Sequence, residues 1–278
     1  MARSKAGRSD AGHAGGPWKT ALTSIERNRI LVRGYPIDEM MGRLHFGETI
    51  YLLLTGELPP PSIGRLVDAM LVSFIDHGAT PPSTLAARNA ATTGATLRGS
   101  LATGVLAFGK YYGGDILACR HLLDDGLKLI HSGTSEAAAA ESVVSGLAAA
   151  GTDATPGFGH RYHTTDPRAT RLLQLAHELE VSHEYTQFLR CIERTFARHP
   201  AFEGRALPVN IDGAIAAVCG DIGIAPEVAD ALIIVSRLPG LAAHILEEQH
   251  REPPMRVINP SDHAYDGPME RRLPERRK

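Results

Sequence analysis

The 278-residue chain has few cysteines, few aromatic side chains and little net charge. Its three cysteines, Cys119, Cys191 and Cys219, form no Cys-x-x-Cys pair, so a disulfide framework is not expected and a cytoplasmic location is predicted. Aromatic residues make up 5% of the chain, and the formal net charge of −2 gives no electrostatic reason to expect nucleic acid or an anionic membrane as a partner. No apolar run in the sequence reaches the ~18 residues of a membrane helix.

Apolar residues at helical spacing recur along almost the whole chain, so the predicted fold class is mainly α. Strand-like sequence occurs only near the N-terminus, where Ile30–Pro36 indicates a short hairpin. We expect helices over residues 37–55, 63–75, 84–108, 116–131, 135–150, 167–179, 181–197, 209–221, 226–237 and 241–249. Pro239 is expected to separate the last two, because proline interrupts a helix interior. The regularly spaced glycines of 84–108 predict close packing against another backbone.

Both ends of the chain differ in composition from the region between them. Residues 1–19 are rich in small and basic side chains and have no apolar segment of the kind found in a secretory signal, so they are predicted to form a disordered tail. A folded domain is expected over 20–268. The segment 269–278 is highly charged and is predicted to be a solvated tail rather than a nucleic-acid contact.

The segment Gly157-Phe158-Gly159-His160-Arg161 places an imidazole after two glycines, which allow a ligand to approach the main chain. The segment lacks the third glycine of a dinucleotide fingerprint and the Gly-Lys-Ser/Thr ending of a phosphate-binding loop. His160 and His163 have no cysteine or acid at the usual zinc-ligand spacing, so no metal site is expected. Taken alone, His160 could equally be a structural or merely exposed histidine.

Four further residues could act with His160 on a small carboxylate substrate. Arg168 follows an Asp-Pro pair typical of a helix start, where a cation is disfavoured unless an anion binds nearby. Asp212 lies in an apolar stretch, where burial raises the pKa of an unpaired acid toward that of a general acid or base; the alternative is a helix N-cap. His77 and Arg237 each end a predicted apolar helix and could be ordinary C-terminal residues.

As a set, these residues make the chain resemble the citrate synthase superfamily. The resemblance runs in family order from about residue 24 to residue 268 and covers nearly all of the expected folded domain. The matching segments are Arg33–Ile37, Tyr51–Pro59, Asp76-His77, Ser83-Thr84, Gly113-Gly114, Gly157–Arg161, Asp166–Arg168, Asn210–Asp212, Arg237–Gly240 and Ala243-His244.

This resemblance implies a mostly helical homodimer, or a higher homo-oligomer, with a large and a small subdomain around an active-site cleft. The small subdomain is expected over roughly 113–212. The implied catalytic residues are His160, which contacts the substrate hydroxyl or keto oxygen, Asp212, which exchanges a proton with the acetyl carbon, and His77.

Binding residues are also implied by the resemblance. His77, Arg168 and Arg237 would hold substrate carboxylates. Coenzyme A enters as the thioester of the substrate, and no separate cofactor is implied. The residues expected to carry coenzyme A are Pro156, Gly157, Phe158, Gly159 and Arg161, chiefly through the main chain.

Three departures separate the chain from the synthase pattern. A helical section usual in the synthases between Pro59 and Asp76 is missing. Tyr112 stands immediately before Gly113-Gly114, where the synthases have a catalytic histidine. Asn259-Pro260 stands where the synthases have an Arg-Pro that reaches the substrate of a neighbouring subunit. All three features are similar to those of the citryl-CoA lyase module at the end of ATP-citrate lyase and of free-standing citryl-CoA lyases.

The resemblance therefore implies an enzyme that cleaves citryl-CoA, or a related 3-hydroxy-3-carboxyacyl-CoA, into acetyl-CoA and oxaloacetate. In this scheme His160 is the base or the partner of the tertiary hydroxyl, and Asp212 is the acid that reprotonates carbon. Tyr112 can donate a hydrogen bond to the thioester oxygen. Two alternatives stay open: a small citrate or methylcitrate synthase, which condenses an acyl-CoA with oxaloacetate, and a non-catalytic coenzyme A-binding protein.

Overall fold

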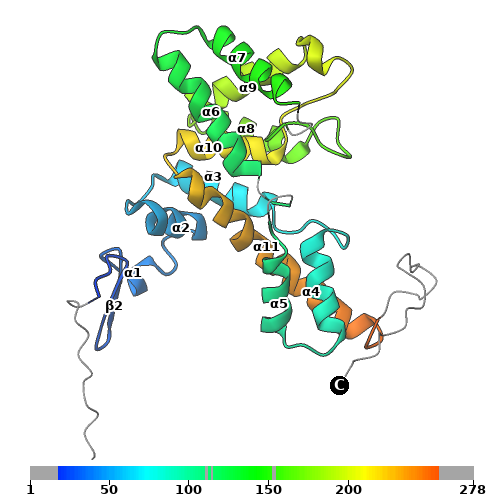
Figure 1. The fold of residues 1–278 in the computed structure, drawn as a ribbon. Helices are drawn as coiled ribbons and strands as arrows, with labels where there is room; N and C mark the ends of the chain where they lie inside the picture. Colours follow the sequence, from blue (N-terminus) through cyan, green and yellow to red (C-terminus); the bar gives the residue numbers. More distant parts are fainter. Residues whose placement is uncertain (1–17, 110–111, 114, 152–154, 257–278) are drawn as a thin grey trace, which may run out of the picture.

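The protein is mainly helical, as predicted, with a small sheet at its N-terminal end (Figure 1). The computed structural model describes residues 18–109, 112–113, 115–151 and 155–256. Most of the predicted 1–19 tail and all of the 269–278 tail lie outside the described residues, so both tails stay predictions. The small subdomain predicted over 113–212 also stays a prediction.

Three short antiparallel strands form the sheet, in the order β1-β2-β3. They are β1 (Thr23–Glu26), β2 (Arg29–Val32) and β3 (Tyr35–Pro36). The predicted hairpin is confirmed and is longer than expected, because β1 pairs with β2 from Thr23 opposite Val32 to Glu26 opposite Arg29. In Figure 1 this ribbon projects away from the helices, which agrees with its exposed side chains.

Most of the predicted helices are present at nearly the expected bounds. The helices are α1 (Ile37–Met40), α2 (Phe46–Thr55), α3 (Pro61–Ser73), α4 (Pro82–Thr92), α5 (Leu97–Leu106), α6 (Asp115–His131), α7 (Glu136–Ala149), α8 (Pro167–Glu178), α9 (Glu184–Phe196), α10 (Ile211–Asp221) and α11 (Pro226–Arg251), with a 3-10 turn η1 (Pro200–Phe202). The region 37–55 is two helices rather than one. Gly56 ends α2 in the left-handed conformation, at a φ of 90°.

The main core surrounds α10, whose side chains from Ile211 to Cys219 are almost all buried. Helices α6, α8, α9 and α11 pack against α10, which lies near the middle of the molecule in Figure 1. A smaller apolar cluster joins α4 to the later half of α11, through Ala87, Ala91, Leu241 and Ile245. Helix α11 thus belongs to both clusters and connects them.

One long helix was predicted over 84–108, and this prediction was wrong. Helices α4 and α5 form a hairpin instead, with Gly94 in the connecting turn at a φ of +83°. The prediction of close backbone packing holds for Gly104, because a Cβ there would lie 3.0 Å from the Ser83 carbonyl oxygen. The glycines therefore have two different roles, one in a turn and one at a helix contact.

The predicted break at Pro239 was also wrong, because α11 continues through it. Residues on either side of the proline hold the helix against the end of α3: the Ser236 side chain donates to the Leu71 carbonyl, and the main chain of Gly240 packs closely on the Ile75 carbonyl. By length and composition α11 could span a membrane, contrary to the expectation that no segment reaches that length. It packs instead against α3, α4, α5, α6 and α10 in the described structure.

Candidate active site

The loop that carries His160 is tied to the segment that enters α10. Phe158 and Val209 form an isolated antiparallel bridge. Beside it, the Gly159 N–H donates to Pro208 O at 2.8 Å, and the Asn210 N–H donates to Gly157 O at 3.0 Å. These backbone bonds join two loops that are about fifty residues apart in sequence.

Two glycines allow this close approach. Gly157 has a φ of +81°, and a Cβ added there would lie 2.9 Å from Gly213 Cα. A Cβ at Gly213 would in turn strike the Gly157 carbonyl oxygen. The loop of His160 and the first turn of α10, which holds Asp212, are therefore in contact through their main chains.

Asn210, rather than Asp212, is the N-cap of α10. The Asn210 Oδ1 accepts from the Gly213 N–H at 3.1 Å, and its Nδ2 donates to Gly159 O at 2.9 Å. The N-cap interpretation of Asp212 is therefore wrong. Asp212 lies in the first helical turn, half-buried, and its charge adds to burial in raising the pKa of the neighbouring Cys119 thiol. The sequence did not single out Asn210 as the residue that joins the two loops.

Asp166 is the most highly bonded carboxylate around the site. It is the predicted N-cap of α8, accepting from the Arg168 N–H at 3.0 Å. Its Oδ2 also accepts from the Ile211 N–H at 3.1 Å, which fixes the start of α10 to the start of α8. Burial alone would raise the pKa of Asp166, but the hydrogen bonds and charge of Arg168 outweigh burial and hold that pKa below its usual value.

Arg168 lies on the first turn of α8, as predicted, but it already has an anionic partner. Its Nε donates to Asp166 Oδ1 at 3.0 Å, and a terminal nitrogen donates to Asp166 Oδ2 at 2.9 Å. Asp166 thus supplies a carboxylate from two residues away that offsets the cost of a cation at this helix start, and binding of a substrate carboxylate by Arg168 stays a prediction. The Arg168 guanidinium also lies 5.7 Å from the centre of the Phe74 ring.

Arg237 approaches the same phenylalanine from α11. Arg237 is only 2% exposed, and its Nε donates to the Phe74 carbonyl at 2.8 Å. A terminal nitrogen of Arg237 donates to the Tyr112 hydroxyl at 3.2 Å. Arg237 is therefore not the C-terminal residue of a helix, as the sequence suggested, but an interior residue of α11 whose guanidinium is directed toward α3 and Tyr112.

Tyr112 is held on three sides. Its ring stacks on Phe108 at a centroid distance of 5.1 Å, and its hydroxyl lies 2.8 Å from Ser83 Oγ. Ser83 lies in the first turn of α4, whose N-cap is Pro81, and the Ser83 hydroxyl is buried against Tyr112. The tyrosine that replaces a histidine in the synthase pattern is thus bonded to Arg237 and Ser83.

His77 lies beyond the end of α3, so its predicted place as a helix C-cap was wrong. Partial burial lowers the pKa of its imidazole, and the charges of Arg237, Arg168 and His160 lower it further, while Asp76 opposes them. These interactions bring His77 into one electrostatic neighbourhood with three other predicted site residues. The neutral imidazole is therefore favoured near neutral pH.

His160 has a defined tautomer in this structure. Its Nδ1 accepts from the backbone N–H groups of Tyr162 and His163, both at 3.1 Å. A neutral ring with an accepting Nδ1 carries its proton on Nε2, so we assign that nitrogen as a donor. Burial lowers the pKa of His160, and the nearby His163 lowers it further.

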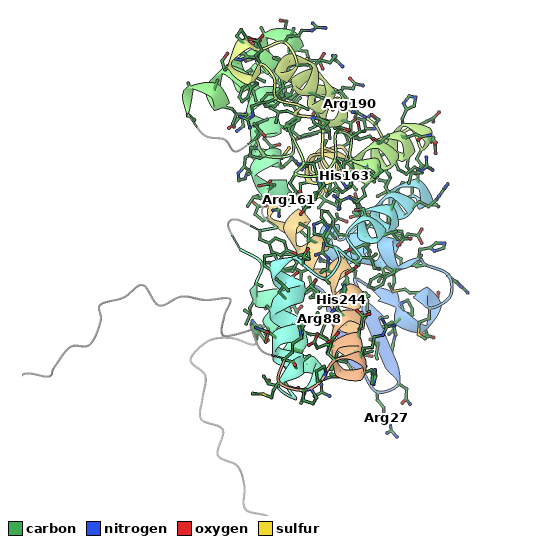
Figure 2. The ribbon with its side chains drawn as sticks, turned by 90° about the vertical axis from the view of Figure 1, so that its right-hand side faces the viewer. Arg27, Arg88, Arg161, His163, Arg190 and His244 are labelled. Carbon is green, nitrogen blue, oxygen red and sulfur yellow. The ribbon has the colours of Figure 1, made fainter. Side chains whose placement is uncertain are left out.

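The predicted coenzyme A-binding loop presents main chain more than side chain. Phe158 is 4% exposed and packs edge-on against Phe196 at 5.0 Å between ring centres, so its side chain belongs to the core. Pro156 and Gly159 are half-buried beside it. Arg161 is exposed and is labelled with His163 in Figure 2. Gly114 and Asn259-Pro260, which were part of the resemblance, lie outside the described residues.

Comparison with known proteins shows the family and the fold of the chain. Residues 59–261 match the family model "Citrate synthase, C-terminal domain". A citryl-CoA lyase from Hydrogenobacter thermophilus is similar in structure, with a TM-score of 0.83 and 37% identity over 92% of this chain and 97% of that one. A citrate synthase from Pyrobaculum aerophilum gives a TM-score of 0.66 and 26% identity over 83% of this chain and 55% of that one.

Among curated sequences, "Putative citrate synthase 2" of Mycobacterium tuberculosis is 30% identical over 216 residues, which cover 76% of this chain and 53% of that protein. The chain thus spans about half the length of the curated relatives it matches. The family model covers well over half of the chain, in the region that holds the bonded loops described above. The chain belongs to the citrate synthase family.

Proposed function

We propose that the protein cleaves citryl-CoA, or a related 3-hydroxy-3-carboxyacyl-CoA, into acetyl-CoA and oxaloacetate. The observation that carries this proposal is the environment of Tyr112, which stands where the synthase pattern has a histidine and is bonded to the carboxylate-binding candidate Arg237. The similarity to a citryl-CoA lyase over nearly the full length of both chains supports the same activity.

In the proposed reaction, Arg168 and Arg237 bind carboxylates of the citryl group. Both guanidiniums flank Phe74, one over the ring and one at the carbonyl, so they can hold two carboxylates of one small molecule. Arg168 keeps its bond to Asp166 while a substrate carboxylate takes its remaining donors, since a guanidinium has five N–H groups. The orientation of the substrate is then set by rigid helix ends.

Bond cleavage needs a proton acceptor at the tertiary hydroxyl and a donor at the acetyl carbon. With Nδ1 occupied by two backbone N–H groups, His160 fits as a hydrogen-bond donor to the substrate oxygen through Nε2. His77, whose pKa is lowered, is the neutral imidazole proposed to accept the hydroxyl proton. The electron pair of the C–C bond passes to the thioester as an enolate.

Asp212 completes the cycle in this proposal. Its protonated carboxyl delivers a proton to the methylene carbon of the enolate, which yields acetyl-CoA and leaves a carboxylate. The proton held by His77 then returns to Asp212 through solvent, so the enzyme is restored without a net change of charge. The loop 156–161 is proposed to hold coenzyme A chiefly by its main chain, because the Phe158 side chain is buried in the core.

The test is a coupled assay in which oxaloacetate released from citryl-CoA is reduced by malate dehydrogenase and NADH. We expect turnover by wild type and losses of about 10²–10⁴-fold for His160→Ala and Asp212→Asn. Matched controls are His131→Ala and Asp125→Asn, which change exposed residues in surface ion pairs. Unchanged turnover in both site variants would overturn the assignment of these residues.

The same assay separates the two other candidates. A citrate or methylcitrate synthase releases free thiol when acyl-CoA and oxaloacetate are mixed, whereas the proposed lyase consumes citryl-CoA without hydrolysing its thioester. A non-catalytic coenzyme A-binding protein leaves citryl-CoA unchanged. The bonded pair of Tyr112 and Arg237 favours the lyase over the synthase, because it occupies the place of the histidine that the synthase pattern requires.

We also propose a cytoplasmic homodimer. The three cysteines are free and buried, which fits a reducing compartment. The hairpin α4–α5 and α11 carry exposed apolar side chains that a second copy is proposed to cover: Leu85, Leu97, Leu106, Val235, Leu238 and Leu246. Light scattering on a sizing column tests this, and a monomer at micromolar concentration would contradict it.

A further inference from the structure

A histidine outside the proposed site is bonded to the segment that carries His77. His244, on α11, has its Nε2 3.0 Å from Asp76 Oδ1. Asp76 immediately precedes His77, while His244 lies two helical turns beyond Arg237 on the same helix. In Figure 2, His244 is labelled beside Arg88, where α11 and α4 pack together.

The carboxylate of Asp76 makes hydrogen bonds that restrain the backbone around His77. Its Oδ1 faces His244, and its Oδ2 accepts from the Gly78 N–H at 3.0 Å. Burial opposes ionisation of Asp76, but the backbone N–H groups of Gly78 and His77 and the nearby His244 outweigh it and lower its pKa. The backbone on both sides of His77 is therefore fixed by one ionised group, and that group is fixed by His244.

The rest of α11 supports the same contact. Gly240, one turn before His244, packs against the Ile75 carbonyl, and a Cβ at Gly240 would lie 2.9 Å from Asp76 Oδ1. Arg237 holds the Phe74 carbonyl at 2.8 Å. Residues 74–76 thus run along α11, and the His244–Asp76 bond is the last attachment before His77.

The second ring nitrogen of His244 is buried and has no hydrogen-bond partner in the described structure. Glu247 Oε2 lies 3.7 Å from this Nδ1, and Arg88 lies 3.4 Å from the same carboxylate. The imidazole of His244 therefore makes a single hydrogen bond in the described structure, through Nε2 to Asp76. That bond is the contact by which α11 can act on His77.

We propose that His244 is a positioning residue for His77. Acting through Asp76, it holds the His77 imidazole at a fixed position relative to Arg237, which lies on the same helix as His244. The inference rests on the proposed function, since His77 matters in this way only if the site binds a carboxylate substrate. Removal of the bond loosens the segment 75–78 and displaces the proposed proton acceptor, so the chemical step is slowed more than substrate binding is weakened.

The experiment compares His244→Ala, His244→Gln and the control His250→Ala, an exposed histidine on the same helix. We expect His244→Ala to lower kcat for citryl-CoA by about tenfold, the effect of one hydrogen bond to a charged group, with a smaller change in KM. The glutamine variant retains a donor near the Nε2 position and restores most of the loss. His250→Ala changes neither constant.

Amide hydrogen exchange provides a readout that is independent of catalysis. Exchange in a peptide covering residues 74–80 is expected to speed up in His244→Ala and in Asp76→Ala, and no further in the double variant. Unchanged exchange in folded His244→Ala overturns the positioning role, as does an equal loss in the alanine and glutamine variants. A wild type that cleaves no citryl-CoA counts against the proposed function alone, because the exchange result still decides whether His244 holds the segment.

Discussion

Gly157 and Gly213 pack main chain against main chain, and this contact brings the loop of His160 to the first turn of the helix that carries Asp212. The two glycines come from segments with little resemblance to each other in sequence. One lies in a loop at positive φ and the other in the first turn of α10. Their contact is a direct structural reason for regarding His160 and Asp212 as parts of one site.

Gly213→Ala is predicted to destabilise the protein and to lower activity. The added Cβ would strike the Gly157 carbonyl, and overpacking of this kind costs about 1–3 kcal/mol. The matched control is Gly146→Ala in α7, where nothing lies within 4 Å of the added Cβ, so that variant should be neutral or stabilising by up to about 1 kcal/mol. Urea unfolding measures both, and equal stability of the two variants would contradict the contact.

Asp166→Asn is predicted to be among the most destabilising single substitutions around the site. The side chain is fully buried and bonds both Arg168 and the Ile211 N–H, and breaking a buried ion pair costs about 3–5 kcal/mol. Asp125→Asn, in an exposed pair with Lys128, should change the free energy of unfolding far less, because solvent screens the pair. Comparable losses in the two variants would show that the Asp166 bonds contribute little.

The effect of Asp166 on stability should depend on pH in one direction. Its folded-state pKa is lowered, so its stabilisation is present above the ordinary value of 3.8 and is lost as the pH falls through the lower folded-state pKa. The difference in unfolding free energy between wild type and Asp166→Asn should therefore shrink below pH 3.8. A difference that grows on acidification would contradict this assignment.

The acid limb of kcat/KM for citryl-CoA is predicted to lie below pH 6.5, the ordinary imidazole value. Burial and neighbouring cations lower the pKa of both His77 and His160. The proposed mechanism needs a neutral His77 as proton acceptor and an unprotonated Nδ1 on His160, which accepts the two backbone hydrogen bonds of its loop. His163→Asn removes a charge that lowers the pKa of His160, so it should move the limb to higher pH. A limb above pH 6.5 in wild type would argue against the proposed proton acceptor.

Tyr112→Phe is predicted to raise KM by about tenfold or more. The substitution removes the hydroxyl that accepts from buried Arg237 at 3.2 Å, and a hydrogen bond to a charged group is worth about 1.5–3 kcal/mol. Steady-state kinetics separate this effect from a donor role at the thioester oxygen. A fall of about 10²–10³-fold in kcat with unchanged KM would mean that Tyr112 acts on the reacting atoms instead.

Much of the secondary structure follows from local chemistry that a sequence displays. The Asp166–Pro167 pair correctly predicted the start of α8, and the predicted helix end at residue 55 is the end of α2. Local rules failed where tertiary contacts decide the outcome. Pro239 does not break α11, because Ser236 and Gly240 hold both sides of it against the end of α3.

The site was predictable as a set of residues but not as a set of bonds. His77, His160, Arg168, Asp212 and Arg237 could be singled out by their types and by a resemblance. The bond from Asp166 to the Ile211 N–H joins residues 45 positions apart, and nothing in the sequence indicates which of several carboxylates makes it. The hydrogen bond between His244 and Asp76 is equally absent from the sequence pattern, since the two residues are 168 positions apart.

Cleavage of citryl-CoA in deuterated water tests the central claim most directly. The proposed enolate takes its third methyl hydrogen from the solvent-exchanged carboxyl of Asp212, so mass spectrometry should find acetyl-CoA with one deuterium, together with oxaloacetate and no free coenzyme A. Asp212→Asn should form little of either product. Citrate with free coenzyme A, or acetyl-CoA without deuterium, would contradict the account.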